Sequence, residues 1–94
     1  MVKEVHFVLP HSWVYLEVKD AKGESQVWAL EATGRGGLER IGVTRAYIKP
    51  GDTVKVRCHR LKDGNNGCLL GFLEAKDGTV KDWDGNNAPN PTDF

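Results

Sequence analysis

The stretch WVYLEV at residues 13–18 decides the fold, because its apolar side chains recur at every second position. A period of two is typical of a β-strand with one buried face, and Val14 and Leu16 would lie on that face. The DAKG segment at residues 20–23 predicts a hairpin turn, and QVWALE at residues 26–31 predicts the partner strand. The sheet is therefore expected to start from an antiparallel hairpin.

Three further segments extend the same pattern along the chain. Residues 5–9, 53–61 and 68–75 alternate in the same way, and each predicts a strand. Gly71 lies in the middle of the last segment, where a glycine indicates a bulge or a tight bend. The chain is therefore predicted to hold five strands.

The centre and the end of the chain break the pattern. Residues 33–37 (TGRGG) hold three glycines, which leave the backbone too free for regular structure, so one short helical turn at residues 38–41 is the most we expect there. From Asp84 onward no periodicity remains. We therefore predict a β-barrel domain at residues 1–83 and an irregular tail at residues 84–94.

The predicted elements define the fold class. Five strands with one short helix between the third and the fourth are the inventory of a small antiparallel barrel of the OB type. An open meander or a small sandwich is the competing architecture. The expectation is therefore an all-β, five-stranded OB-like barrel with one short helix and an irregular C-terminal tail.

The charge balance limits the classes of binding partner that we expect. Thirteen basic and thirteen acidic residues give a formal net charge of zero, whereas a nucleic-acid or anionic-membrane binder would carry an excess of positive charge. No apolar run reaches the roughly 18 residues of a membrane span, so we expect neither partner. The basic residues gather in residues 33–62. This clustering predicts either a patch neutralised by the acidic tail and loops or an anion site beside the glycines.

The cysteines and the first residues bear on the compartment. Cys58 and Cys68 lie ten residues apart and lack the paired CxxC spacing of a zinc site. Two small buried thiols are the preferred interpretation, while a disulfide across a hairpin and a metal role stay open. Residues 1–10 carry charges and precede no apolar stretch of signal-peptide length. We expect the chain as given to be cytoplasmic, or periplasmic where a leader has been removed.

An ordered series of short motifs resembles a known family. The chain has Pro-His at residues 10–11 before a strand, Gly-Val-Thr-Arg at residues 42–45 and Lys-Pro-Gly-Asp at residues 49–52 before another strand. Together they resemble a family of small, usually exported bacterial proteins known only as a domain of unknown function. The resemblance implies an OB-like β fold and brings no established activity. The chain departs from that family at Leu9, where Asn is usual, and at Val43, where Trp is common.

His11 is the leading candidate for chemistry. The proline before it fixes the backbone, and the strand entrance places it at the rim of the predicted barrel. An imidazole titrates near neutral pH and can act as a base, an acid or a metal ligand; a hydrogen bond within the turn is the structural alternative. Ser12 points away from His11 on a strand, and neither a GxSxG nor a P-loop motif is present, which disfavours hydrolase chemistry.

The preferred function is binding of a small anionic or amphipathic ligand, without a cofactor. Trp13, Tyr15 and Trp28 would line its pocket, since aromatic side chains on paired strands offer an apolar wall. Arg45 would pair an anionic group through its fork of donors, with Tyr47 beside it.

Two other classes of function stay open. The first is a cofactor-free acid–base enzyme, an isomerase or a lyase, that uses His11 with a carboxylate. The second is copper or zinc binding through histidines, although His6, His11 and His59 do not follow a metal-ligand spacing and no metal ligand is assigned. Exposed aromatic residues on a thin core also leave a homodimer open.

Overall fold

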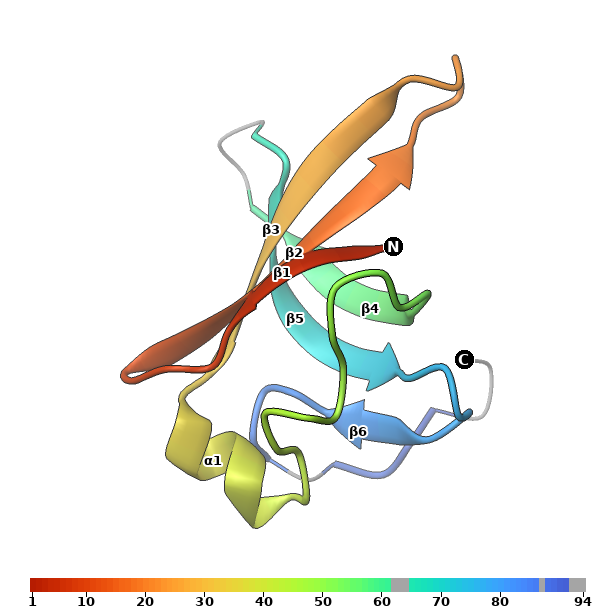
Figure 1. The fold of residues 1–94 in the computed structure, drawn as a ribbon. Coiled ribbons are helices and arrows are strands. Elements are labelled where there is room, and N and C mark those ends of the chain that lie inside the picture. Colours follow the sequence, from red (N-terminus) through yellow and green to blue (C-terminus); the bar gives the residue numbers. More distant parts are fainter. Residues whose placement is uncertain (62–64, 87, 92–94) are drawn as a thin grey trace.

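The computed structural model of the chain describes residues 1–61, 65–86 and 88–91 and is mainly β (Figure 1). Within these described residues it contains six strands and one short helix. In chain order these are β1 (Val2–His6), β2 (His11–Lys19), β3 (Ser25–Thr33), α1 (Arg35–Arg40), β4 (Lys55–Arg60), β5 (Gly67–Glu74) and β6 (Val80–Asp82). In the described part of the chain, no helix has the length and apolar character to cross a membrane.

The strands form one sheet in the order β1-β2-β3-β5-β4, with β6 paired to β5. The pairing differs from the predicted five-stranded antiparallel barrel. A sixth strand is present, β3 and β5 run parallel, and β1 and β4 are the two ends of an open sheet. Among the described residues, the chain before β4 forms backbone hydrogen bonds with β1 at Val2, whose N–H donates to Asp52 O over 2.8 Å and whose carbonyl accepts from Gly51 N–H. Gly51 has a φ of 94°, so the backbone turns there instead of continuing along β1.

The predicted hairpin of β2 and β3 is confirmed and is the longest pairing in the sheet. The two strands pair from His11 opposite Thr33 to Lys19 opposite Ser25. At the turn, the Asp20 carboxylate accepts hydrogen bonds from the backbone N–H groups of Lys22 and Glu24. These bonds hold the pKa of Asp20 below its ordinary value, and the bond from the Glu24 backbone contributes most.

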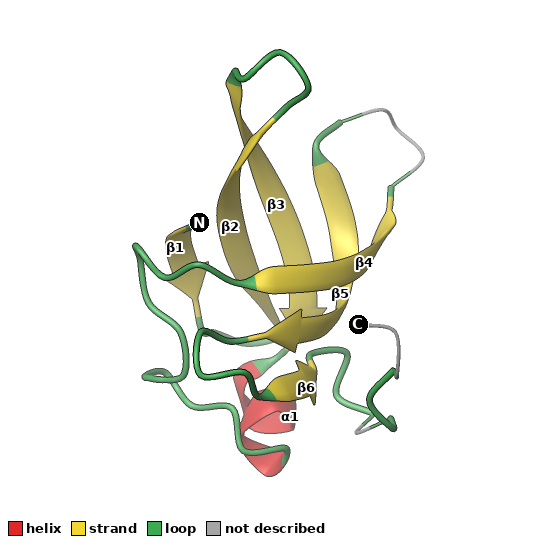
Figure 2. Cartoon of the chain, turned by 90° about the vertical axis from the view of Figure 1, so that its right-hand side faces the viewer, coloured by secondary structure: helices red, strands yellow, loops and turns green. Residues whose placement is uncertain are grey.

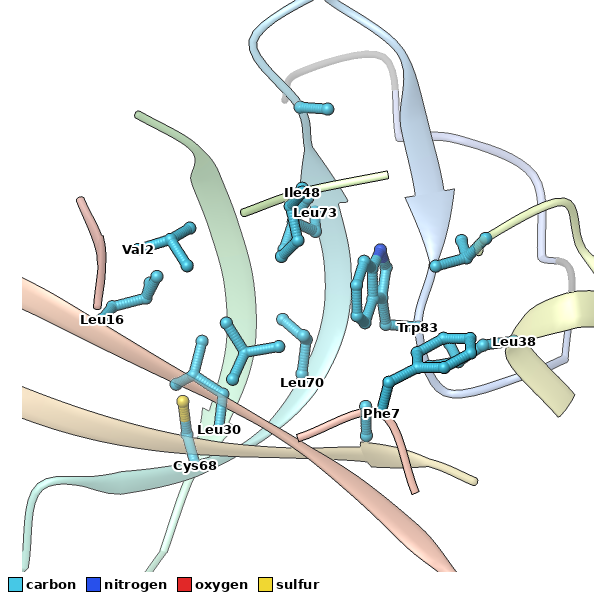
Figure 3. Close-up of a cluster of buried hydrophobic side chains, with 14 residues drawn as sticks. Val2, Phe7, Leu16, Leu30, Leu38, Ile48, Cys68, Leu70, Leu73 and Trp83 are labelled. Atoms are coloured by element: carbon cyan, nitrogen blue, oxygen red, sulfur yellow. The ribbon is translucent and has the colours of Figure 1, made fainter. Parts of the chain in front are cut away.

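The two ends of the sheet differ. Figure 2 shows α1 beneath one end, while the β2–β3 hairpin projects at the other. The core is filled on the α1 side, where Leu38 and Trp83 are buried and lie near Phe7 (Figure 3). Leu30 and Cys68 lie toward the opposite side of the same cluster. One end is therefore plugged by the helix and by Trp83, and the other end is not.

The helix begins earlier than predicted. Residues 33–37 were expected to lack regular structure, and this is wrong because α1 starts at Arg35 and includes two of the glycines. Its Leu38 is fully buried, and this tertiary packing outweighs the helix cost of glycine. Gly34 precedes the helix, and any Cβ there would clash with the carbonyl oxygen of Pro10. The glycine therefore lets α1 dock against the β1–β2 turn.

The β4–β5 hairpin carries a bulge and a disulfide. Arg57 lies opposite Phe72 and Cys58 opposite Leu70, so Gly71 is the extra residue of a bulge, as predicted. Cys58 and Cys68 form a disulfide with a Cα–Cα distance of 5.8 Å.

The preferred interpretation of these cysteines as two reduced thiols is therefore wrong, and the alternative of a hairpin disulfide holds. Neighbouring antiparallel strands bring the two Cα atoms into the range that a disulfide spans. Of the predicted tail, residues 87 and 92–94 lie outside the described residues.

Candidate functional site

The unplugged end of the sheet holds an apolar cleft of about 250 Å³. Strands β2 and β3 form one wall and strands β4 and β5 form the other, as Figure 2 lets the reader follow. We call this cleft the mouth. It is lined by Leu16, Val18, Trp28, Leu30, Val56, Cys58 and Cys68.

An aromatic ring and a cation lie at the edge of the mouth. Trp28 is half-buried, and the guanidinium carbon of Arg60 lies 5.2 Å from the centre of its ring, which is a cation–π contact. Arg60 was predicted only as one of the basic residues within 33–62 and not as a pocket residue. The signal was present, because the period of two places Arg60 on the same face as Val56 and Cys58.

A polar rim adjoins the mouth at Trp28. Trp28 also lines a second depression, together with Asp20, Gln26 and Asn66. The Gln26 amide donates to Asp20 Oδ2 over 3.3 Å, and the Asn66 amide donates to Gln26 Oε1 over 3.2 Å. The mouth thus combines an apolar interior with hydrogen-bonding side chains at its edge.

His11 occupies a separate depression on the outer face. Its Nδ1 lies 2.7 Å from Glu31 Oε2, and the two side chains are 58% and 28% exposed. Thr33 and Asp84 line the same depression, whose volume is about 250 Å³. A carboxylate on one ring nitrogen orients the imidazole and leaves the other nitrogen for proton transfer. The structure therefore places a histidine–carboxylate pair in this depression on the outer face of the sheet.

Trp13 and Tyr15 lie on the outer face of the sheet and Trp28 on the inner one. Trp13 pairs with Glu31 in the β2–β3 register, while Trp28 pairs with the buried Leu16. The rings of Trp13 and Tyr15 stack with centroids 6.5 Å apart. The structure therefore does not bring the three predicted aromatic residues into one pocket.

Arg45 and Tyr47 are also apart from the mouth. Arg45 lines a groove of about 460 Å³ beside β1. The Tyr47 hydroxyl is hydrogen-bonded to Thr79 Oγ1, and its ring centre is 6.3 Å from that of Trp83. Tyr47 thus packs at the plugged end, where it is half-buried.

The predicted basic patch is spread over several surfaces. Arg40 lies on α1, Arg45 and Lys49 lie in the connector before β4, and Arg60 lies at the mouth. Lys62 is outside the described residues. The basic residues therefore serve several local environments and not one site at the glycine-rich segment.

The three histidines do not converge on a metal site. His6 lies 3.1 Å from Glu4, His11 contacts Glu31, and His59 pairs with Leu69 at the opposite edge of the sheet. Within residues 1–61, 65–86 and 88–91, no three His, Cys, Asp or Glu side chains form a group that could hold a metal ion.

The fold and these hollows define a small, mainly β domain with one plugged end and one apolar mouth. Residues 1–70 match a family of unknown function, DUF6152, and the chain belongs to this family. The predicted membership of a domain-of-unknown-function family is thus confirmed. Neither a search of curated proteins nor a search of solved structures found a match.

Proposed function

We propose that this protein binds small amphipathic anions, such as medium-chain carboxylates, in the mouth. The observation that carries the proposal is the apolar cleft between β2–β3 and β4–β5, which the core does not fill. Burying apolar surface contributes roughly 25 cal/mol per Å². An apolar chain that enters the mouth would therefore be stabilised by the same effect that builds the core beneath it.

Arg60 supplies the site for the charged end of such a ligand. Its guanidinium lies over Trp28 at the edge of the cleft, so a chain inside the mouth would leave its carboxylate near Arg60. Guanidinium groups bind carboxylates through two parallel hydrogen bonds. Gln26 and Asn66 bind to each other at the rim and keep that side of the opening polar.

We infer that the sheet is an OB-like barrel closed at a single point. The support is the strand order β1-β2-β3-β5-β4 together with the two backbone hydrogen bonds between Val2 and residues 51–52, just before β4. An OB-fold is a partly open five-stranded barrel. In this arrangement α1 plugs one end of the barrel and the mouth is the other end.

The test of the proposed function is a titration with octanoate and with octanol. Octanoate is expected to change the tryptophan fluorescence saturably. Val56→Phe fills the mouth and should weaken octanoate binding by about tenfold or more, which is about 1.4 kcal/mol. Val27→Phe is the matched control, because Val27 is exposed and lies opposite Glu17 outside the mouth.

The charged end is tested separately. Arg60→Gln should weaken octanoate binding by about tenfold and leave octanol binding within about twofold, because only the carboxylate uses the guanidinium. An octanoate affinity that neither variant changes, or a signal that does not saturate, would contradict the proposal.

The pairing of His11 with Glu31 favours a second candidate function, cofactor-free acid–base catalysis. The 2.7 Å contact orients the imidazole in a depression that a small carbonyl compound could enter. The expected result is deuterium incorporation beside the carbonyl of small oxo acids in D₂O, lost in His11→Gln and reduced in Glu31→Gln. Incorporation at the buffer rate with the unaltered protein would exclude this candidate.

A further inference from the structure

We propose that the open edge of β1 binds an extended acidic peptide segment as an additional β-strand. This site is separate from the mouth and does not depend on the function proposed above. Three features of the molecule support it: the hydrogen-bonding direction of β1, the shape of the groove beside it and the charge of that groove.

The backbone of β1 presents hydrogen-bonding groups to this edge. Met1 and Glu17 exchange two hydrogen bonds, N–H of each to the carbonyl of the other. In an antiparallel ladder such bonded pairs alternate with non-bonded pairs. Val14 is three residues from Glu17 along β2, so its pair with Val5 is a non-bonded one. The N–H and C=O of Val5 therefore point away from β2, toward the open edge.

At Val2, its first residue, β1 already forms backbone hydrogen bonds along this edge. Val2 donates to Asp52 O and accepts from Gly51 N–H, both over 2.8 Å. In the part of the chain that the structure describes, no other backbone–backbone bond joins β1 to this connector. The backbone N–H and C=O of Val2 are therefore bonded within the chain. Those of Val5, farther along the same edge, have no backbone partner among the described residues.

A groove of about 460 Å³ runs beside the unfilled part of the edge. Its walls come from residues 4–8 on one side and from Arg45 and residues 48–50 on the other. Val5, Phe7 and Ile48 supply apolar surface. Five residues of strand span about 17 Å, so the groove suits an extended segment whose alternate side chains reach the apolar wall.

The charge of the groove favours an acidic occupant. Arg45 and Lys49 are exposed at its rim, and neither forms an ion pair with a described residue. Glu4 also lines the groove, so the lining holds one carboxylate against these two cations. Acidic side chains on an added strand would meet the two cations, which raises both affinity and the rate of encounter.

The same features disfavour a second copy of this chain as the occupant. A register shift between Val2 and Glu4 marks a bulge in β1, and a bulge on an edge strand works against pairing with an identical strand. Pairing of two β1 edges would also bring two sets of Arg45 and Lys49 together, which is unfavourable. The peptide of a partner protein has neither difficulty.

The test uses the peptide acetyl-EVEVEV-amide and the full chain. Amide hydrogen exchange read by NMR is expected to slow by about tenfold or more at Val5 when the peptide is bound, because its N–H gains a partner. A peptide of the same sequence, with alternate backbone nitrogens methylated to remove the N–H donors of one edge, should bind about tenfold more weakly. Acetyl-KVKVKV-amide should not bind.

Matched variants separate charge from strand pairing. Arg45→Gln with Lys49→Gln should weaken peptide binding by about tenfold, while Lys19→Gln with Lys22→Gln, at the distant hairpin, should not change it. Octanoate in the mouth should not compete with the peptide. The proposal is overturned if the peptide does not bind at millimolar concentration, if the methylated peptide binds equally well, or if the chain alone self-associates with protection at Val5.

Discussion

Trp83→Ala is expected to lower the free energy of unfolding by about 3–5 kcal/mol, the largest effect of any single truncation in this chain. The side chain is 1% exposed and fills the plugged end of the sheet beside Tyr47. Its backbone also joins two strands, since Thr33 N–H donates to Trp83 O and Trp83 N–H donates to Gly71 O. Alanine keeps these backbone bonds and leaves a cavity the size of an indole. Urea denaturation followed by circular dichroism measures the loss.

The control is the same truncation at the other end. Trp28 is only half-buried at the mouth, so Trp28→Ala is expected to cost about half as much stability or less, because the cost follows the apolar area removed from water. It should nevertheless abolish the fluorescence response to octanoate. Equal losses of stability in the two variants would contradict the difference between a plugged and an open end.

The second large effect is expected from the disulfide. Replacing Cys58 and Cys68 together with alanine should lower the free energy of unfolding by about 3 kcal/mol, because the bond closes a loop of about ten residues and restricts the unfolded chain. The bond also joins β4 to β5 within the wall of the mouth. Its loss should therefore also weaken octanoate binding.

A reductant provides the control for this prediction. Thermal unfolding of the unaltered protein should move to lower temperature when the reductant is added, and the double variant should melt at the same temperature with and without it. If the reductant leaves the unaltered protein unchanged while mass spectrometry shows two alkylated thiols, the disulfide does not stabilise this fold.

The parts of the fold that depend on neighbouring residues could be predicted from the sequence. The β2–β3 hairpin follows from alternating side chains on both sides of a turn with Gly23, and the bulge follows from Gly71 within an apolar strand. These features are local, so a pattern over a few residues contains the information. The five predicted strands therefore lie within three residues of the observed bounds of β1 to β5, whereas β6 was not predicted.

The features that were missed depend on contacts between distant residues. The parallel pairing of β3 with β5 brings Ala29 beside Gly67, which no local pattern contains. The start of α1 depends on the contact of Gly34 with Pro10 and on the burial of Leu38. The disulfide likewise depends on the register of β4 against β5.

Individual residues of the candidate sites could be predicted from the sequence, but their arrangement in space could not. Alternation along β2 places Trp13 and Tyr15 on one face, but the opposite position of Trp28 follows only from the register of β2 with β3. The carboxylate partner of His11 was expected as a residue type, and Glu31 comes from the neighbouring strand. Arg45 was expected beside the aromatic residues, but it lies in the groove at β1.

Methyl NMR of the chain during titration with octanoate tests the proposed binding site most directly. The methyl groups of Leu16, Leu30 and Val56 in the mouth are expected to shift together and to saturate at one affinity. The methyl groups of Leu38 and Val43, which are buried in the core outside the mouth, are expected to stay in place. Shifts confined to Leu38 and Val43, or no saturable shift at the mouth, would contradict the proposal that the open end of this sheet is a ligand site.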